Sequence, residues 1–506
     1  MSYVLAIDEG TTGVTCLMIG HDGRVAGRGY REIPQYYPHP GWVEHDAMEI
    51  FDVVRQAARE AIAATGAAPA ALGITNQRET VVVWERATGR PVHRAIVWQD
   101  RRTAQRCQQL ASRAAWIAER TGLIPDPYFS ATKLEWLIGD QRLLQRYAPG
   151  ELAAGTIDSW LVWQLTGGRV HATDPTNASR TMLYDIDERR WSSELCALFG
   201  VPMEMLPEVR RSSGSFGFAA AEHFGTEIPI LGIAGDQQAA LFGNGCVERG
   251  SGKNTYGTGA FLLLNTGAER PPSAAGLLTT IACDATGGPA YALEAAIFIA
   301  GAAVQWLRDG LGIIERAGDT EALARSIAST DGVYFVPALT GLGAPAWEPD
   351  ARGTIVGLTR GSGRAHLARA ALEAMAYGTA DVIGSMRDAS GVPFERLRVD
   401  GGATVNDWLM QFQADVLGVP VERPSMVETT ALGAAGLAGI AAGIWSSAED
   451  FASKRRFVAF APRMDRSDAD ALVQGWRRAV RAAVSWARDG RAAPRERGTQ
   501  GAAGTP

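Results

Sequence analysis

Short apolar runs alternate with amphipathic stretches from the start of the chain. Between Met48 and Thr65 apolar residues recur every three or four positions behind Asp46, which predicts an amphipathic helix with an aspartate cap. Four shorter runs around it are rich in β-branched and aliphatic residues and are bounded by glycine turns, which predicts strands. These strands are expected at 3–7, 15–19, 25–30 and 71–75. The opening of the chain is therefore expected to be a β-sheet layer with helices packed on it.

The same mixed pattern continues to about residue 487 and predicts an α/β protein. A glycine-rich stretch at 245–259 begins a second series of strands, so a domain boundary is expected near residue 245. We expect domains at 1–245 and 246–487. The stretch 488–506 is rich in Arg, Gly, Ala and Pro without periodicity and predicts a disordered tail. The clearest later elements are strands at 261–264, 334–337 and 397–399, and helices at 302–308, 366–383 and 406–417.

The composition is that of a soluble globular protein. The chain has 506 residues, 46% hydrophobic and 21% charged, with a net charge of -6. An acidic balance argues against nucleic acid or an anionic membrane as the main partner, and no apolar run is long enough to predict an integral membrane segment. Five scattered cysteines without a Cys-x-x-Cys pair favour a reducing, cytoplasmic location and no zinc site. Nearly all cationic residues are arginines, which we interpret as a coding bias without functional meaning.

A carboxylate beside glycine follows an apolar run at three places. These are Asp8-Glu9-Gly10-Thr11-Thr12-Gly13, Gly235-Asp236 and Asp400-Gly401-Gly402. Glycine lets backbone N–H groups approach a phosphate closely, and a carboxylate can hold hydrated magnesium or accept a proton. One such turn is ordinary loop chemistry, but three of them in both halves of the chain predict a nucleotide site between two related domains.

Several longer segments resemble the glycerol kinases of the FGGY carbohydrate kinase family. They are Gly73-Ile74-Thr75-Asn76-Gln77-Arg78-Glu79-Thr80, Asp126-Pro127-Tyr128-Phe129-Ser130, Gly235-Asp236-Gln237-Gln238 and Lys253-Asn254-Thr255-Tyr256-Gly257-Thr258-Gly259. The resemblance extends from about residue 3 to about 485. It implies two RNase H-like domains of the actin/hexokinase/Hsp70 ATPase fold with an interdomain cleft. It also implies ATP, Mg²⁺ and glycerol as ligands, and a homodimer or homotetramer.

On the polyol side, the resemblance implies that ATP phosphorylates glycerol to sn-glycerol 3-phosphate with Asp236 as the general base. Arg78 would donate a fork of hydrogen bonds to adjacent hydroxyls, and Glu79 would accept hydrogen bonds from such hydroxyls. Two neighbouring strand residues reach one ligand only where the strand ends. The apolar flanks of Asp236 predict a carboxylate shielded from water. The other expected contacts are Gln237 and Tyr128, with Trp98 and Phe261 as an apolar wall.

On the nucleotide side, the resemblance implies two phosphate loops and an adenosine end. Asp8 is the candidate for organising hydrated Mg²⁺. The expected nucleotide contacts are Thr11, Thr12, Gly13, Thr15, Thr258, Gly301, Gln305, Gly402 and Asn406.

The chain departs from the family pattern at three places. Glu9 stands where most relatives have glutamine, and its charge could repel phosphates or assist magnesium. Thr15 stands where many relatives have an arginine. The loop 219–227, which binds an anionic effector in some relatives, has two glutamates and no lysine or arginine, so we expect no such site. His223 in this loop is expected to be an ordinary surface histidine.

Two other functions remain open at this point. A kinase for another polyol or sugar would share the fold, but the segment Thr75-Asn76-Gln77-Arg78-Glu79 differs from that of ketopentose kinases and favours glycerol. A non-catalytic actin- or Hsp70-like ATPase would need no small-molecule pocket, and Arg78, Tyr128 and Asp236 would then be unexplained.

Overall fold

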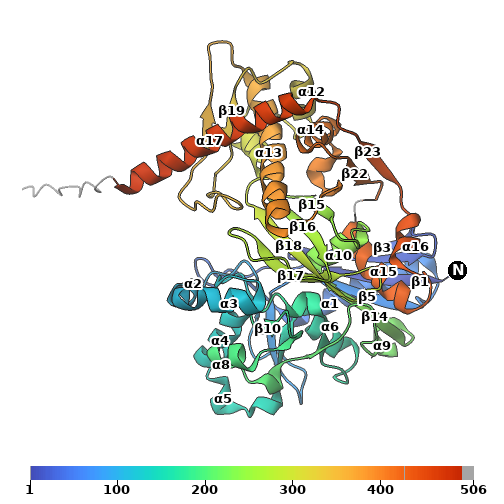
Figure 1. The fold of residues 1–506 in the computed structure, drawn as a ribbon. Coiled ribbons are helices and arrows are strands. Elements are labelled where there is room, and N and C mark those ends of the chain that lie inside the picture. Colours follow the sequence, from blue (N-terminus) through green and yellow to red (C-terminus); the bar gives the residue numbers. More distant parts are fainter. Residues whose placement is uncertain (1, 427, 493–506) are drawn as a thin grey trace, which may run out of the picture.

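Two large sheets form the centres of the two halves of the protein in the computed structural model, which describes residues 2–426 and 428–492 (Figure 1). The N-terminal sheet has the strand order β13-β14-β5-β1-β2-β3. Strands β1, β2 and β3 are antiparallel, whereas β1, β5 and β14 are parallel. The bounds are β1 Tyr3–Glu9, β2 Gly13–Gly20, β3 Val25–Glu32, β5 Ala71–Asn76, β13 Phe218–Ala219 and β14 Ile228–Gly235.

The C-terminal sheet has the order β17-β18-β16-β15-β21-β22-β23. Strand β15 is antiparallel to β16 and parallel to β21, β18 is antiparallel to β16, and β22 is parallel to β21. The bounds are β15 Ser251–Tyr256, β16 Ala260–Gly267, β17 Leu278–Cys283, β18 Pro289–Ile297, β21 Arg396–Gly401, β22 Val421–Pro424 and β23 Phe457–Phe460.

The two sheets repeat one topology. In each, three antiparallel strands are followed by two strands parallel to the first, so that β1, β2, β3, β5 and β14 correspond to β15, β16, β18, β21 and β22. This repeat is the arrangement expected of two RNase H-like domains, and it confirms the predicted fold class. The predicted strands and helices named above all form, with ends shifted by a few residues or fewer in most cases.

Helices cover both faces of the N-terminal sheet. On one face α1 packs against β3, and its first turn is capped by Asp46, whose carboxylate accepts from the backbone N–H groups of Met48 and Glu49. On the other face α15, from the C-terminal half, packs against β1, β5 and β14 (Figure 1). The helices are α1 Ala47–Thr65, α2 Ala104–Gln109, α3 Ala114–Thr121, α4 Ser130–Asp140, α5 Leu143–Arg146, α6 Ile157–Leu165, α7 Pro175–Ala178, α8 Ser193–Leu198, α9 Ala221–Phe224, α10 Asp236–Gly243, α11 Gly301–Asp309, α12 Asp319–Arg325, α13 Arg364–Ser390, α14 Asp407–Leu417, α15 Thr429–Ala441, α16 Ala448–Ser453 and α17 Arg466–Ala492.

Smaller sheets complete the fold. The four-stranded sheet β4-β7-β6-β8 lies in the N-terminal half and positions the segments that follow β5. The remaining strands are β4 Glu44–His45, β6 Val81–Glu85, β7 Ala95–Ile96, β8 Leu152–Thr156, β9 Ala172–Thr173, β10 Tyr184–Asp185, β11 Arg190–Trp191, β12 Glu208–Val209, β19 Tyr334–Val336 and β20 Thr354–Val356.

The last helix, α17, continues to Ala492, past residue 488 where the tail was expected to begin. Ala479, Ala483 and Ala487 are buried along one face of this helix, and this packing holds it on the C-terminal core. The rest of the predicted tail, 493–506, lies outside the described residues. None of the helices within 2–426 and 428–492 has the length and hydrophobicity needed to cross a bilayer.

Candidate functional site

The candidate residues of the N-terminal half meet where three parallel strands end. Asn76 is the register partner both of Glu9 on β1 and of Gly235 on β14. Asp8, the segment after Asn76 and Asp236 at the start of α10 therefore lie side by side at one edge of the sheet. Ligands of open α/β sheets bind at this carboxyl edge.

Arg78 and Glu79 both face one site because β5 has already ended at Asn76. Glu79 has a backbone φ of 62°, in the left-handed region. This conformation is rare for residues other than glycine, and the strain that it causes persists at functional sites where surrounding contacts enforce it. The enforcing contacts go to the Glu79 carbonyl, which accepts from Ser130 Oγ at 3.1 Å and from Lys133 Nζ at 3.0 Å.

The fork of Arg78, which was expected to donate to substrate hydroxyls, faces Glu294 on β18 instead. Nη1 donates to Glu294 Oε2 at 2.5 Å and Nη2 donates to Oε1 at 3.0 Å. Nη1 also donates to Gln238, and Nη2 also donates to the Tyr128 hydroxyl at 3.3 Å. The Nε–H of Arg78 is buried and makes no hydrogen bond within the described part of the chain. The Nε atom lies 3.2 Å from Asp236 Oδ1.

Asp236 has the environment of a proton acceptor. Its Oδ1 accepts from the Gln237 backbone N–H at 2.6 Å. Burial raises the pKa of this carboxyl, and Arg78 and the Gln237 N–H offset part of that increase. The side chain remains 31% exposed, so the shielding expected from its apolar flanks is incomplete. A carboxylate that is partly desolvated yet open on one side can receive a proton from a bound hydroxyl.

The aromatic residues expected around the polyol occupy two places. The rings of Trp98 and Tyr128 form an edge-to-face pair with centroids 5.5 Å apart, and both side chains are half-buried. Phe261 is half-buried on β16, opposite Thr255 and Ala296. Trp98 and Tyr128 thus form an apolar wall beside Arg78.

The first predicted phosphate loop is the turn between β1 and β2, closed by a hydrogen bond from the Gly10 N–H to the Gly13 carbonyl at 3.0 Å. Thr12 is exposed, while the Thr11 hydroxyl accepts from Trp98 Nε1 at 2.8 Å. This hydrogen bond joins the loop directly to the aromatic wall. Thr15 lies opposite Asp8 in the register of β1 and β2.

The second predicted loop lies in the C-terminal half, at the edge of a cavity of about 470 Å³. The Gly301 and Ala302 N–H groups donate to the carbonyls of Gly257 and Thr258, which ties the start of α11 to the turn between β15 and β16. All the predicted nucleotide contacts of this half line the cavity: Thr258, Gly301, Gln305, Gly402 and Asn406. A helix start and a glycine turn facing one cavity suit an anionic ligand.

Asp8, the predicted magnesium residue, lies near two other carboxylates, Asp236 and Glu428. Burial, together with the nearby Asp236 and Glu428, raises the pKa of Asp8 to about 7, so a cation beside it would relieve electrostatic repulsion. No cluster of three or more metal-ligating side chains occurs in the described part of the chain. A single carboxylate at the end of β1 fits Mg²⁺ that keeps water and takes phosphate oxygens, since such an ion needs only one or two carboxylates. Asp400, by contrast, is buried and accepts from Asn244 and Thr429.

Two of the residues named in the departures, Glu9 and His223, lie in the protein interior. Glu9 is fully buried, and its Oε1 accepts from Gln77 Nε2 at 2.8 Å. Burial raises the pKa of Glu9 well above its usual range despite this hydrogen bond, so the charged form of this carboxyl is less favoured here than in water. The expectation for His223 is wrong: it is 5% exposed and packs edge-to-face on Phe51.

Four charged residues of the site were missed by the sequence analysis. Arg180 and Glu294 lie in segments without a recognised motif. Lys133 and Lys253 are two of the three lysines in the chain, and both are fully buried. Lys253 Nζ donates to Gln237 Oε1 at 2.5 Å, which holds a predicted polyol contact from across the domain boundary. The sequence does contain a signal for Lys133 and Lys253: lysine is rare in this chain, so each retained lysine is a candidate for a specific role. The sequence analysis interpreted that rarity as a coding bias only.

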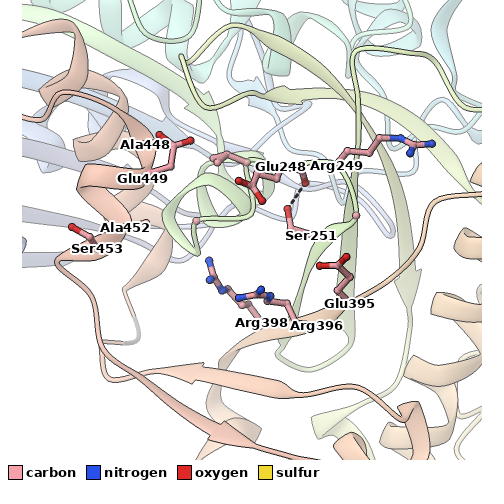
Figure 2. A pocket seen from close by; sticks show the side chains of 13 residues that line it. Glu248, Arg249, Ser251, Glu395, Arg396, Arg398, Ala448, Glu449, Ala452 and Ser453 are labelled. Carbon is pink, nitrogen blue, oxygen red and sulfur yellow. Dashed lines mark hydrogen bonds between the residues drawn. The ribbon is translucent and has the colours of Figure 1, made fainter.

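A separate cavity of about 320 Å³ lies between the start of β15, the start of β21 and α16 (Figure 2). None of the predicted site residues lines it. Its charged side chains are of both signs, and Arg398 is already engaged by Glu422 at 3.0 Å and by the Asn244 carbonyl. This cavity lies beyond the end of α10 that is opposite Asp236 and is not part of the candidate site.

Comparison with known proteins identifies relatives over nearly the whole chain. Residues 3–243 match the N-terminal domain, and residues 252–442 the C-terminal domain, of the FGGY family of carbohydrate kinases. A glycerol kinase of Deinococcus radiodurans is 52% identical over 496 residues, covering 97% of this chain and 99% of its own. A glycerol kinase of Delftia acidovorans is 54% identical over 494 residues, covering 95% and 99%.

Solved structures agree with this result. The crystal structure of Plasmodium falciparum glycerol kinase with ADP has a TM-score of 0.91 and 36% identity to this chain, covering 96% of this chain and 98% of its own. A xylulose kinase from Lactobacillus acidophilus has a TM-score of 0.87 at 20% identity, covering 97% and 100%, and supports the fold alone.

Proposed function

Because this chain belongs to the FGGY family of carbohydrate kinases, we propose that it transfers the γ-phosphoryl group of ATP to a terminal hydroxyl of glycerol, giving sn-glycerol 3-phosphate. The observation that carries the proposal is the convergence of Arg78, Glu79, Tyr128 and Asp236 at the strand ends that also carry the first phosphate turn. A polyol held there lies beside the phosphate loop, as in-line transfer requires.

In this proposal Asp236 accepts the proton of the attacking hydroxyl. Its raised pKa improves the carboxylate as a base, and the Gln237 N–H fixes the orientation of Oδ1. The Nε–H of Arg78 donates to the glycerol oxygens, and Glu79 accepts from a second hydroxyl. Trp98 and Tyr128 cover the carbon chain and exclude water, and Phe261 is proposed to close the wall from β16.

The nucleotide is proposed to bind with its adenosine end in the 470 Å³ cavity of the C-terminal half. Its phosphates would extend from Thr258 and Gly301 toward the turn at Thr11 and Thr12. Mg²⁺ bound to ATP would supply neutralisation of the phosphate charge, and Asp8 would hold its hydration shell. The free, buried cysteines are consistent with the expected cytoplasmic location, and a homodimer or homotetramer remains the expected assembly.

The test is a substrate panel with MgATP, comparing kcat/KM for glycerol, dihydroxyacetone, erythritol and xylulose. We expect glycerol to be preferred by at least about tenfold, because each buried hydrogen-bonding group left unpaired by a wrong substrate costs roughly 1–3 kcal/mol. A preference for xylulose would support the related sugar kinase instead. ATP hydrolysis without phosphorylation of any acceptor would support the non-catalytic ATPase scaffold.

A further inference from the structure

Two charged residues outside all the recognised segments complete the polyol side of the site. Arg180 follows α7 and is fully buried, and Glu294 on β18 is 3% exposed. Arg180 belongs to the N-terminal family domain and Glu294 to the C-terminal one. Neither residue is assigned a role in the proposed reaction.

Glu294 determines which part of Arg78 faces the substrate. Its two carboxylate oxygens accept hydrogen bonds from the two terminal nitrogens of Arg78, at 2.5 and 3.0 Å. Gln238 and Tyr128 accept further hydrogen bonds from the terminal nitrogens of Arg78, so the Nε–H edge of the guanidinium faces Asp236. A two-point carboxylate–guanidinium pair fixes the plane of both groups, which a single hydrogen bond does not do.

Arg180 connects this pair to Glu79. Its Nε donates to Glu79 Oε1 at 2.7 Å, and its Nη2 donates to Glu294 Oε1 at 2.9 Å. Arg78 Nε lies 3.7 Å from the same Glu79 oxygen, which closes a ring of two cations and two anions. Burial alone would raise the pKa of Glu294, but Arg180 and Arg78 outweigh it and hold that pKa at about 2, so the carboxylate is charged at neutral pH.

We propose that Glu294 and Arg180 are positioning residues, through which the C-terminal domain orients Arg78 and Glu79 for the polyol. This inference rests on the proposed function, since it concerns the same acceptor site. The ring crosses the domain boundary, so the polyol site is complete only when the two domains are in contact. A buried ionic ring adds little net stability compared with apolar packing, whereas the geometry it imposes is specific.

The position of Glu294 also connects the polyol site to the nucleotide. Strand β18 ends at Ile297, and four residues later the same segment begins α11 at Gly301, which lines the nucleotide cavity. A nucleotide that contacts the start of α11 therefore contacts the same chain segment that carries Glu294. We expect glycerol to bind more tightly in the presence of a nucleotide, and this increase to depend on Glu294.

The first experiment measures steady-state kinetics of Glu294→Gln in the full-length protein. Glutamine keeps the shape but replaces a charged two-point partner with one neutral acceptor. A hydrogen bond to a charged group contributes roughly 1.5–3 kcal/mol, so the KM for glycerol should rise about 10–150-fold, while the KM for ATP changes less than about threefold. Calorimetry with a non-hydrolysable ATP analogue should show that the tightening of glycerol binding is lost.

Glu373→Gln is the matched control. Glu373 is also a buried glutamate of the C-terminal half and is paired with Arg369 at 2.8 Å and with the Tyr377 hydroxyl at 2.9 Å, but it does not contact the polyol residues. Its replacement should have no selective effect on glycerol. A similar rise in the glycerol KM of both variants would overturn the inference, because the effect would then not be specific to the residues that contact Arg78.

A double-mutant cycle with Arg78→Ala tests whether Glu294 acts through Arg78. Once Arg78 is absent, Glu294→Gln should have a smaller effect on glycerol binding than in the wild type, because only its path through Arg180 to Glu79 remains; fully additive effects would overturn the inference. Arg180→Lys provides the second variant if Glu294→Gln does not fold, since lysine keeps the charge but cannot bridge two carboxylates in a fixed plane. An unchanged glycerol KM in Arg180→Lys would likewise overturn it. Absence of glycerol phosphorylation by the wild-type protein would instead contradict the proposed function.

Discussion

Replacing Asp236 with asparagine should remove turnover while leaving the fold intact. Asparagine keeps an oxygen that can accept from the Gln237 N–H, so the hydrogen bond of 2.6 Å is preserved, but its amide cannot take up a proton. Loss of a general base costs about 10²–10⁴-fold in rate, or roughly 3–5 kcal/mol of activation free energy. ADP affinity should change little, because Asp236 does not line the nucleotide cavity.

The stability of this variant gives a second, independent readout. The pKa of Asp236 is raised in the folded protein, chiefly by burial, so the charged form is disfavoured by folding at neutral pH. A neutral asparagine removes this cost, and Asp236→Asn should melt at the same temperature as the wild type or higher. The assay is coupled ADP release with saturating glycerol and MgATP, with the exposed Asp388→Asn as the control. Turnover within about fivefold of the wild type would refute the assignment of Asp236 as the base.

Three further outcomes are expected. Trp98→Phe keeps an aromatic ring but removes the N–H that donates to Thr11. Steady-state kinetics should show that kcat/KM for ATP falls by roughly 2–12-fold, the equivalent of about 0.5–1.5 kcal/mol. Gly301→Ala would place a Cβ 2.6 Å from the Gly257 carbonyl and displace the start of α11, so calorimetry should show weaker nucleotide binding, with glycerol binding unchanged when no nucleotide is present. The pKa of Glu294 is about 2 in the folded protein against 4.5 for the free side chain. The charged carboxylate therefore contributes fully to the free energy of unfolding above about pH 4.5, and this contribution is lost as the pH falls toward 2. Urea titrations should accordingly show that the stability difference between wild type and Glu294→Gln shrinks on acidification.

The elements near the site were predictable from sequence because their determinants are local. The apolar run of β5 ends at Asn76, and the two charged residues after it follow from that end. Asp46 caps α1 through its own side chain. Gly257 and Gly301 approach closely because neither has a side chain. Such features depend on neighbouring residues or on backbone freedom.

The partners of the charged residues were not predictable in the same way. Arg78 meets Glu294 across 216 residues of sequence, and the pairing depends on how the two domains pack. Burial of His223 against Phe51 depends on the contact between α9 and α1. Helix α17 continues beyond residue 488 because its alanine face packs on the C-terminal core. In each case the cause is a tertiary contact that leaves no local pattern.

The most direct test of the central claim is to follow the phosphoryl group itself by ³¹P NMR, with the protein, MgATP and glycerol in one sample. The account predicts a new phosphomonoester resonance of sn-glycerol 3-phosphate that grows in equal amount with ADP, and that is absent over the same period with Asp236→Asn. Release of inorganic phosphate in place of the phosphomonoester, or a phosphomonoester formed only when glycerol is replaced by a sugar, would contradict it.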